Sequence, residues 1–204
     1  MSAGKKSQLG QFYTTNFEYI FNGMIVPYHS HIIEPFAGDG DLVEFANLFS
    51  PKEIELYDID PKKKCITERD TLKNPPDYTD KFVLTNPPYL AKNKHKGDKG
   101  VFIQYKHDDL YKCFISSLVD SGCAGGIIII PLNFWCSIRK ADALLRRRFL
   151  NKYTIIRVNV FYEKVFRDTG YTVCSLNFRP KRRVTSVDEV TMRFYPDRSS
   201  AVIK

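Results

Sequence analysis

A run of four consecutive isoleucines, Ile127–Ile130, restricts the possible folds of this chain more than any other feature of its sequence. The run lies within the apolar segment Gly126–Pro131, so both faces of an extended strand would be apolar there. Such a strand must be buried on both sides, as in the middle of a parallel sheet that helices cover on each face. We therefore predict a layered α/β fold with this segment near the centre of its sheet.

Short apolar segments alternate with amphipathic segments along much of the remaining chain. The predicted strands are His31–Phe36, Ile54–Asp58, Cys65–Thr67, Phe82–Thr85, Gly126–Pro131, Tyr153–Val160, Tyr171–Phe178 and the edge strand Val190–Tyr195. The predicted helices are Asp41–Phe49, Leu110–Ser121 and Ile138–Phe149. This alternation predicts a Rossmann-like, doubly wound and mostly parallel sheet. We expect a single domain over residues 1–204, in which residues 179–204 form a basic tail.

Composition limits the class of protein without identifying it. The chain has 31 Lys and Arg against 23 Asp and Glu, a formal net charge of +8, which favours a polyanionic partner such as nucleic acid. Its five cysteines are scattered and contain no CxxC pair, so we expect free thiols and no metal site. Its apolar runs are too short to span a bilayer, so we expect no membrane association and a cytoplasmic location.

A glycine-containing turn follows the first predicted strand. The segment Glu34–Gly40, with the sequence EPFAGDG, leads from that strand into a predicted helix. Glycines allow a tight turn and a close approach of the backbone to a ligand, and ligands of parallel sheets bind at the carboxyl ends of the strands. A turn can also use glycine for its shape alone, so this segment by itself leaves a cofactor role and a structural role equally open.

An aspartate, Asp58, ends the second predicted strand, 20 residues after Gly38. A carboxylate at this position can accept hydrogen bonds from both ribose hydroxyls of a nucleoside ligand. The alternative is a turn or helix-capping aspartate. Its position after the glycine turn favours the ribose role, whereas Asp60, which precedes Pro61, is better explained as a cap or turn residue.

The segment Asn86-Pro87-Pro88-Tyr89 directly follows the strand Phe82–Thr85. An amine conjugated to an aromatic ring is a poor nucleophile and needs hydrogen-bond acceptors that draw it towards a tetrahedral arrangement. The side-chain oxygen of Asn86 and the backbone carbonyl of Pro87 can supply them, and two prolines hold the loop rigid. Tyr89 offers a flat face for stacking on a planar group. The alternative, a proline-rich strand terminator, explains less of this order of residues.

Together these segments resemble the S-adenosylmethionine-dependent DNA adenine-N6 methyltransferases of restriction-modification systems and large DNA viruses. The resemblance covers Gly10 to about Phe178 and fits the group in which the cofactor motif precedes the catalytic motif. It implies that Gly10–Thr15 lies against the methionine part of the cofactor and that Asp70 accepts a hydrogen bond from the cofactor adenine. It also implies a late antiparallel hairpin containing Val173–Phe178, and a bacterial cytosol or a virus-infected host cell as the location.

The resemblance implies a set of site residues. Those assigned to S-adenosyl-L-methionine are Gln11, Tyr13, Thr14, Thr15, Glu34, Pro35, Phe36, Ala37, Gly38, Gly40, Asp58, Ile59, Asp70, Thr71, Leu72 and Asn86. The catalytic residues would be Asn86, Pro87, Pro88 and Tyr89. The implied reaction is methylation of N6 of adenine in double-stranded DNA after the base has been flipped out of the duplex. One of Phe161, Tyr162 and Phe166 would stack on that base opposite Tyr89, and core packing is the alternative for each.

Basic residues in two segments are candidates for DNA phosphates. Lys92, Lys94, Lys96 and Lys99 follow the Asn86 motif in a polar loop, Ala91–Gly100, and Arg179 and Lys181 follow the last core strand. A solvated loop and a charged tail are the alternatives. Arg146–Arg148 lie on a predicted helix, where adjacent residues point in different directions, so we interpret them mainly as a solvated face.

Two other functions use the same features. Methyltransferases that act on RNA adenine or on a protein glutamine share the Asn-Pro-Pro-Tyr motif, because their target nitrogens pose the same electronic problem. A non-catalytic nucleic-acid-binding subunit on this fold would be expected to have lost the cofactor turn or the catalytic motif, and both are intact here. Only about 26 residues follow Phe178, so DNA recognition would require short insertions or further chain.

Overall fold

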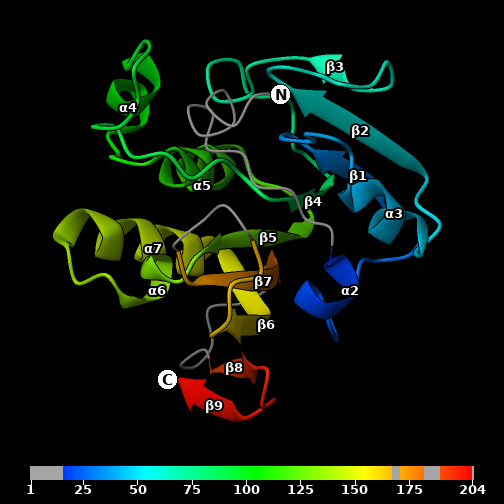
Figure 1. Ribbon diagram of the computed structural model, residues 1–204, viewed down its shortest axis with the longest axis vertical. Helices are drawn as coiled ribbons and strands as arrows, with labels where there is room; N and C mark the ends of the chain where they lie inside the picture. The colour runs from blue at the N-terminus through cyan, green and yellow to red at the C-terminus, as the bar shows by residue number, and fades with distance from the viewer. Residues whose placement is uncertain (1–15, 167–170, 182–188, 204) are drawn as a thin grey trace.

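The computed structural model describes residues 16–166, 171–181 and 189–203, and its strands form one nine-stranded mixed sheet (Figure 1). The strands are β1 His31–Glu34, β2 Glu53–Asp58, β3 Thr67–Glu68, β4 Phe82–Thr85, β5 Gly125–Pro131, β6 Tyr153–Phe161, β7 Val173–Pro180, β8 Val190–Tyr195 and β9 Ser200–Ile203. The helices are α2 Phe17–Ile20, α3 Leu42–Asn47, α4 Gly100–Tyr105, α5 Leu110–Ser121, α6 Asn133–Cys136 and α7 Lys140–Lys152. The strand order is β3-β2-β1-β4-β5-β7-β6-β8-β9.

The isoleucine run lies where its composition requires. β5 is the central strand of the order, between β4, to which it is parallel, and β7, to which it is antiparallel. The side chains of Ile127–Ile130 are all 0% exposed. β7 also pairs antiparallel with β6, which confirms the predicted mostly parallel sheet with a late antiparallel hairpin.

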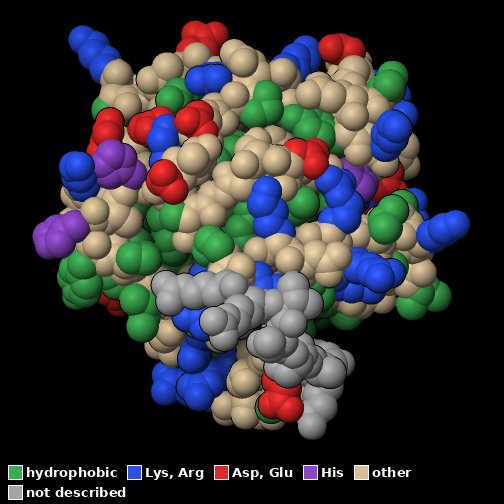
Figure 2. All heavy atoms as spheres, turned by 180° about the vertical axis from the view of Figure 1, so that it is seen from behind, with side chains coloured by type: hydrophobic (Ala, Val, Ile, Leu, Met, Phe, Trp, Pro, Cys, Tyr) green, Lys and Arg blue, Asp and Glu red, His purple; other side chains and the backbone are tan. Residues whose placement is uncertain are grey.

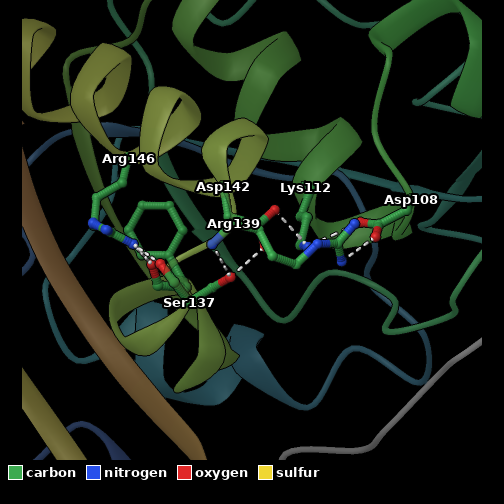
Figure 3. A network of polar contacts seen from close by, with 7 residues as sticks. Asp108, Lys112, Ser137, Arg139, Asp142 and Arg146 are labelled. Atoms are coloured by element: carbon green, nitrogen blue, oxygen red, sulfur yellow. Dashed lines mark hydrogen bonds and ion pairs between the residues drawn. The ribbon is translucent and has the colours of Figure 1, made fainter.

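The helices lie in two groups in Figure 1, with α5 and α7 next to each other on one side of the sheet and α2 and α3 on the other. A buried ion pair joins α5 to α7: Lys112 Nζ lies 2.7 Å from Asp142 Oδ1, and these side chains are 5% and 4% exposed (Figure 3). Lys112 Nζ also lies 2.9 Å from Asp108, and Ser137 Oγ donates to Asp142 at 2.6 Å. Charged groups are rarely buried unless they are paired, so this network fixes how the two helices pack.

The sequence analysis interpreted the arginine run on α7 mainly as a solvated face, and the structure corrects this interpretation. Arg146 donates to the carbonyl oxygens of Phe134 and Ser137 at 2.8 and 3.2 Å. Arg148 donates to Asp120, whereas Arg147 is exposed. Two of the three guanidinium groups therefore hold neighbouring segments against the helix.

The tail contains more structure than the sequence indicated. β8 has the predicted bounds, but it is not an edge strand: it pairs with β6 on one side and with β9 on the other. β9 was not predicted, and neither were α2, α4 and α6, each of which has six residues or fewer. Within the described parts of the chain, every helix is too short or too polar to cross a lipid bilayer.

Candidate active site

The glycine turn between β1 and α3 is held in place by the end of β2. Gly38 and Gly40 have φ angles of +55° and +76°, in the left-handed region that strains any residue with a side chain. The Gly38 N–H donates to Asp58 Oδ2 at 2.8 Å, and the Ala37 N–H donates to the Tyr57 carbonyl oxygen at 2.8 Å. The turn therefore keeps its shape through a neighbouring strand as well as through its own glycines.

Asp58 is buried beside this turn, with 2% of its surface exposed. Its two carboxylate oxygens accept hydrogen bonds from the N–H groups of Gly38 and Asp60, each at 2.8 Å. A carboxylate offers about four acceptor positions, so these bonds do not by themselves exclude a ribose. The turn-stabilising role that the sequence offered as an alternative is present in the structure, and the ribose role stays a prediction.

The segment after β3 forms a third wall of the same site. Thr71 Oγ1 donates to the carbonyl oxygen of Pro35 at 2.9 Å, which ties this segment to the glycine turn. Asp70 Oδ1 accepts hydrogen bonds from the N–H groups of Leu72 and Lys73 at 3.2 and 3.1 Å. Residues from the ends of β1, β2 and β3 are thereby joined at the carboxyl edge of the sheet, where ligands of such folds bind.

These strand ends surround a cavity of about 230 Å³ that also reaches the Asn86 motif. The predicted site residues that line it are Glu34, Phe36, Ala37, Gly38, Asp58, Ile59, Asp70, Thr71, Leu72, Asn86 and Pro88. Pro35, Gly40, Pro87 and Tyr89 do not line it. One cavity thus joins the glycine turn to Asn86. Transfer of a methyl group from a cofactor at the turn to a target at Asn86 requires this arrangement.

The cavity is acidic although the chain is basic. Its lining carboxylates are Glu34, Asp41, Asp58, Asp70 and Asp98. Burial raises the pKa of the Glu34 carboxyl well above its usual value, and the carboxylates of Asp41 and Asp58 raise it further. Arg69 and Lys73 are the permanently charged cations among the described lining residues. This balance of charge favours a ligand with net positive charge.

The Asn86 motif differs from its prediction in the position of Tyr89. Asn86 is half-buried at the cavity, but the Tyr89 ring is only 3% exposed and turns away from it. The Tyr89 hydroxyl lies 2.5 Å from Asn86 Oδ1 and 2.9 Å from the carbonyl oxygen of Ile129. A phenol has a single O–H and donates to one of these oxygens at a time. In this conformation the Tyr89 hydroxyl contacts the Asn86 side chain and the ring is buried, and the stacking role stays a prediction.

The three aromatic residues proposed opposite Tyr89 are engaged elsewhere. Phe161 is 0% exposed and packs against Tyr19 and Tyr195. Tyr162 stacks on Phe194 with ring centroids 5.6 Å apart, and Phe166 is buried. For Phe161 and Phe166, packing within the core was the alternative that the sequence left open, and the structure favours it.

Tyr171 is an aromatic residue beside the motif that the sequence analysis did not select. Its ring lies edge-on to Tyr89 with centroids 6.3 Å apart, and it is 41% exposed. Thr172, the next residue, accepts a hydrogen bond from Leu132 directly after β5. Because β7 runs antiparallel to β5, its first residues return to the edge of the sheet that carries the cavity. The antiparallel hairpin had been predicted, but its pairing with β5, which places Tyr171 beside the motif, had not.

The loop that follows the motif contributes to the cavity as well. His95, Asp98, Val101 and Phe102 line it, together with Leu110 from α5. The sequence analysis had offered DNA phosphates or solvent as the surroundings of the loop Ala91–Gly100, and Val101 and Phe102 follow that loop in α4. Val101 and Phe102 are an apolar pair directly after a polar segment. This pair is the signal that could have indicated that one side of the segment faces the interior of the protein.

The predicted phosphate-binding residues fall into two groups. Lys94, Lys96 and Lys99 are exposed, and Lys92 is half-buried at a second cavity that is also lined by Arg139 and by Asp142 of α7. Arg179 and Lys181 lie at the opposite edge of the sheet from the cavity, because Phe178 pairs with Gly126 at the amino end of β5. Lys181 there donates its N–H to the carbonyl oxygen of Lys152.

Basic side chains do not form a single patch on the face shown in Figure 2. Lys and Arg are spread over that face, with acidic side chains among them. The net charge alone therefore does not locate a nucleic-acid surface there. Gln11, Tyr13, Thr14 and Thr15, which the sequence assigned to the cofactor, lie outside the described residues.

Comparison with known proteins shows which family and which solved structures this chain is similar to. A family model described as Eco57I restriction-modification methylase matches residues 39–166. A protein from Vibrio vulnificus YJ016, assigned as the modification subunit of a type I restriction enzyme, is 15% identical with a TM-score of 0.68, over 95% of this chain and 48% of that one. A protein from Listeria monocytogenes, assigned as a class I S-adenosylmethionine-dependent methyltransferase, is 13% identical with a TM-score of 0.62, over 87% and 61%. No curated protein sequence matches the chain.

The type IIL restriction-modification enzyme MmeI is a further structural match. It is 13% identical with a TM-score of 0.62, and the alignment covers 100% of this chain and 41% of MmeI. The chain therefore spans less than two thirds of the length of each of these three proteins.

A mostly parallel sheet with an antiparallel β7 next to its central strand, and with a cavity at the carboxyl ends of its parallel strands, is the fold of a class I S-adenosyl-L-methionine-dependent methyltransferase. The family model covers more than half of the chain, and the protein belongs to the Eco57I restriction-modification methylase family. S-adenosyl-L-methionine, the cofactor predicted from the sequence, is the methyl donor of this class. It carries a sulfonium and an ammonium group against a single carboxylate, and the acidic cavity suits that charge.

We expect the affinity for S-adenosyl-L-methionine to rise with pH because of Glu34. Its raised pKa keeps the carboxyl protonated over a pH range in which an ordinary glutamate is ionised. Raising the pH through this pKa creates a negative charge that attracts the cationic cofactor. Titration calorimetry from mildly acidic to mildly basic pH measures the effect, and Glu34→Gln should remove it.

Glu44→Gln is the matched control, because Glu44 is an exposed residue of α3. The control should keep the pH dependence of the unaltered protein. An affinity that does not change with pH in the unaltered protein, or that changes equally in Glu34→Gln, would show that Glu34 does not control cofactor binding.

Proposed function

We propose that this protein transfers the methyl group of S-adenosyl-L-methionine to N6 of adenine in double-stranded DNA, acting on a base that has left the duplex. The observation that carries the proposal is the position of Asn86. Its side chain lines the same cavity as Gly38 and Asp58, so the acceptor for the amine and the residues proposed for the cofactor face one space. A structural strand terminator would not need this arrangement.

Asn86 and Pro87 would prepare the nitrogen for attack. The Asn86 side-chain oxygen would accept a hydrogen bond from the amine, which draws the lone pair out of conjugation with the ring. The Pro87 carbonyl oxygen is the predicted second acceptor, although Pro87 does not line the cavity in this structure. S-adenosyl-L-methionine supplies an electrophilic methyl group on a sulfonium, which becomes a neutral thioether when the methyl group leaves. The nitrogen then carries an extra proton, which is lost to solvent. No protein nucleophile is required.

Tyr89 would orient the Asn86 side chain, and Tyr171 would contact the target from the side. The Tyr89 hydroxyl fixes the direction of the Asn86 oxygen through their 2.5 Å contact. Tyr171 is 41% exposed beside it and offers an aromatic face at the edge of the site. A base that leaves its stack loses favourable contacts of about a few kcal/mol, and aromatic side chains can replace part of them.

Two observations favour DNA over the other acceptors that share the motif. The family to which the chain belongs is named for restriction-modification, a process that acts on DNA. The structure of MmeI, which matches the whole length of this chain, was solved in complex with DNA. Adenine in RNA and the glutamine of a release factor pose the same chemical problem, so they serve as the controls.

A methyl-transfer assay tests the proposal. The protein is incubated with labelled S-adenosyl-L-methionine and mixed genomic DNA, with total RNA and a release factor in parallel reactions. Nucleosides from the DNA are then separated by mass spectrometry. We expect N6-methyladenine in DNA and no label in the other acceptors. Methylation of cytosine N4 would contradict the choice of base, and label only in RNA or protein would contradict the choice of substrate.

A further inference from the structure

Residues 92–108, which we call the flap, leave the body of the fold and return to it at one point. Ala91 and Asp109 form an isolated antiparallel bridge there. The Lys92 N–H donates to the Asp108 carbonyl oxygen at 2.8 Å, and the Leu110 N–H donates to the Leu90 carbonyl oxygen at 3.2 Å. The flap contains α4, which lies at the margin of the molecule beyond α5 in Figure 1. A segment whose two ends are pinned together can move as a unit on that base.

The inner side of the flap is a wall of the cofactor cavity. His95, Asp98, Val101 and Phe102 all line the cavity. The His95 and Phe102 rings contact each other with centroids 5.5 Å apart, so the polar and apolar parts of this wall support one another. Any displacement of the flap would therefore open the site that holds the cofactor.

Two polar contacts among the described residues join the flap to the opposite wall of the cavity. Lys73 Nζ lies 3.0 Å from Asp98 Oδ2, and the Tyr105 hydroxyl donates to the Leu72 carbonyl oxygen at 3.0 Å. The Lys73 and Asp98 side chains are 51% and 65% exposed, and an exposed ion pair contributes little to stability. The exposed ion pair therefore holds the flap to the opposite wall only weakly, whereas the buried side chains of Val101 and Phe102 pack in the core.

The outer side of the flap is basic. Its 17 residues contain five lysines and two aspartates. Lys94, Lys96, Lys99 and Lys106 are exposed, and none of them lines the cavity. In this short segment Asp98 lies at the cavity proposed for the cationic cofactor, and the lysines lie at the solvent-exposed surface. The outer surface of the flap therefore suits a polyanion.

We propose that the flap couples the binding of the two substrates: DNA phosphates bound to its outer lysines hold it closed over the cofactor. Cofactor and DNA then tighten each other's binding, and by linkage they must do so by the same factor. The effect requires a flap that is not fully closed in the free protein, which its weak contacts to the opposite wall allow. The inference rests on the proposed function in that the polyanion is DNA.

Calorimetry measures the coupling directly. S-adenosylhomocysteine, which cannot react, is titrated into the protein alone and into the protein saturated with a mixed-sequence DNA duplex. We expect the duplex to tighten its binding about tenfold, within the usual range of coupling between sites. Fluorescence anisotropy of a labelled duplex, with and without S-adenosylhomocysteine, should give the same factor for DNA.

A triple variant tests whether the flap carries this coupling. In Lys94→Gln/Lys96→Gln/Lys99→Gln the coupling factor should fall to about one, and the slope of log affinity against log salt should decrease by about three. The matched control, Lys52→Gln/Lys140→Gln/Arg147→Gln, removes the same charge from exposed positions outside the flap. The control should keep the tenfold coupling.

The outcomes separate this inference from the proposed function. If DNA binds and is methylated on adenine but leaves the affinity for S-adenosylhomocysteine unchanged, the flap inference is overturned and the function stands. Equal loss of coupling in both triple variants would also overturn it, because the effect would then follow net charge. A protein that neither binds nor methylates DNA would overturn both.

Discussion

Asn86→Ala should reduce the rate of methyl transfer by about a hundred- to a thousand-fold while leaving the affinity for S-adenosyl-L-methionine largely unchanged. The substitution removes one of the two acceptors proposed for the target amine, and groups that stabilise developing charge in a preorganised site contribute on this scale. The measurement is single-turnover methylation of DNA together with calorimetry of cofactor binding. A fall in kcat without a matching change in cofactor affinity would place the role of Asn86 in the transition state.

Tyr89→Phe refines this prediction. It keeps the buried ring and removes the hydroxyl that lies 2.5 Å from Asn86 Oδ1. We expect a smaller fall in kcat than for Asn86→Ala, because the amide is still present but less well oriented. Asn151→Ala, at an exposed position of α7, is the control and should not change the rate. Equal loss of cofactor binding and turnover in Asn86→Ala would indicate that Asn86 has a structural role only.

Lys112→Met should lower the free energy of unfolding by about 3–5 kcal/mol, the usual cost of breaking a buried ion pair by removing one partner. The substitution leaves the carboxylate of Asp142, which is 4% exposed, without the ammonium 2.7 Å away (Figure 3). Burial alone would raise the pKa of Asp142, but hydrogen bonds from Lys112 and Ser137 bring it below its usual value. Urea denaturation at neutral pH measures the loss.

A double variant separates the ion pair from simple packing. Lys112→Met/Asp142→Leu removes both charges and should recover part of the lost stability, because no buried charge is left without a partner. Lys140→Met, on the exposed surface of the same helix as Asp142, is the control and should stay close to the unaltered protein. A Lys112→Met variant as stable as the unaltered protein would show that the network does not hold α5 against α7.

Local patterns in the sequence were sufficient for much of the sheet. The predicted bounds of Phe82–Thr85, Leu110–Ser121 and Val190–Tyr195 coincide with β4, α5 and β8. The period of the apolar residues reports which side of a segment is buried, and this period distinguishes a helix from a strand. The central position of the isoleucine run followed from the same argument, because only an interior strand can bury both faces.

Much of the site was also accessible from the sequence. The rule that parallel strands present their ligands at their carboxyl ends predicted that Glu34, Gly38, Asp58 and Asn86 would converge, and all four line one cavity. This rule needs only the order of strand and turn along the chain. It therefore works without knowing which strands are neighbours.

Tertiary structure alone decided the features that depend on strand direction and on packing between distant segments. Arg179 lies away from the cavity and Tyr171 lies beside the Asn86 motif because β7 pairs antiparallel with β5, and the resemblance predicted an antiparallel hairpin but not this partner strand. Tyr89 turns towards the Ile129 carbonyl, and the flap presents Phe102 to the cofactor site, through contacts with residues remote in sequence. The sequence by itself indicated most of the longer strands and helices and the strand ends that line the cavity. Strand pairing decided where the remaining residues lie relative to the cavity. Local sequence does not specify this pairing, because it depends on contacts between residues far apart in the chain.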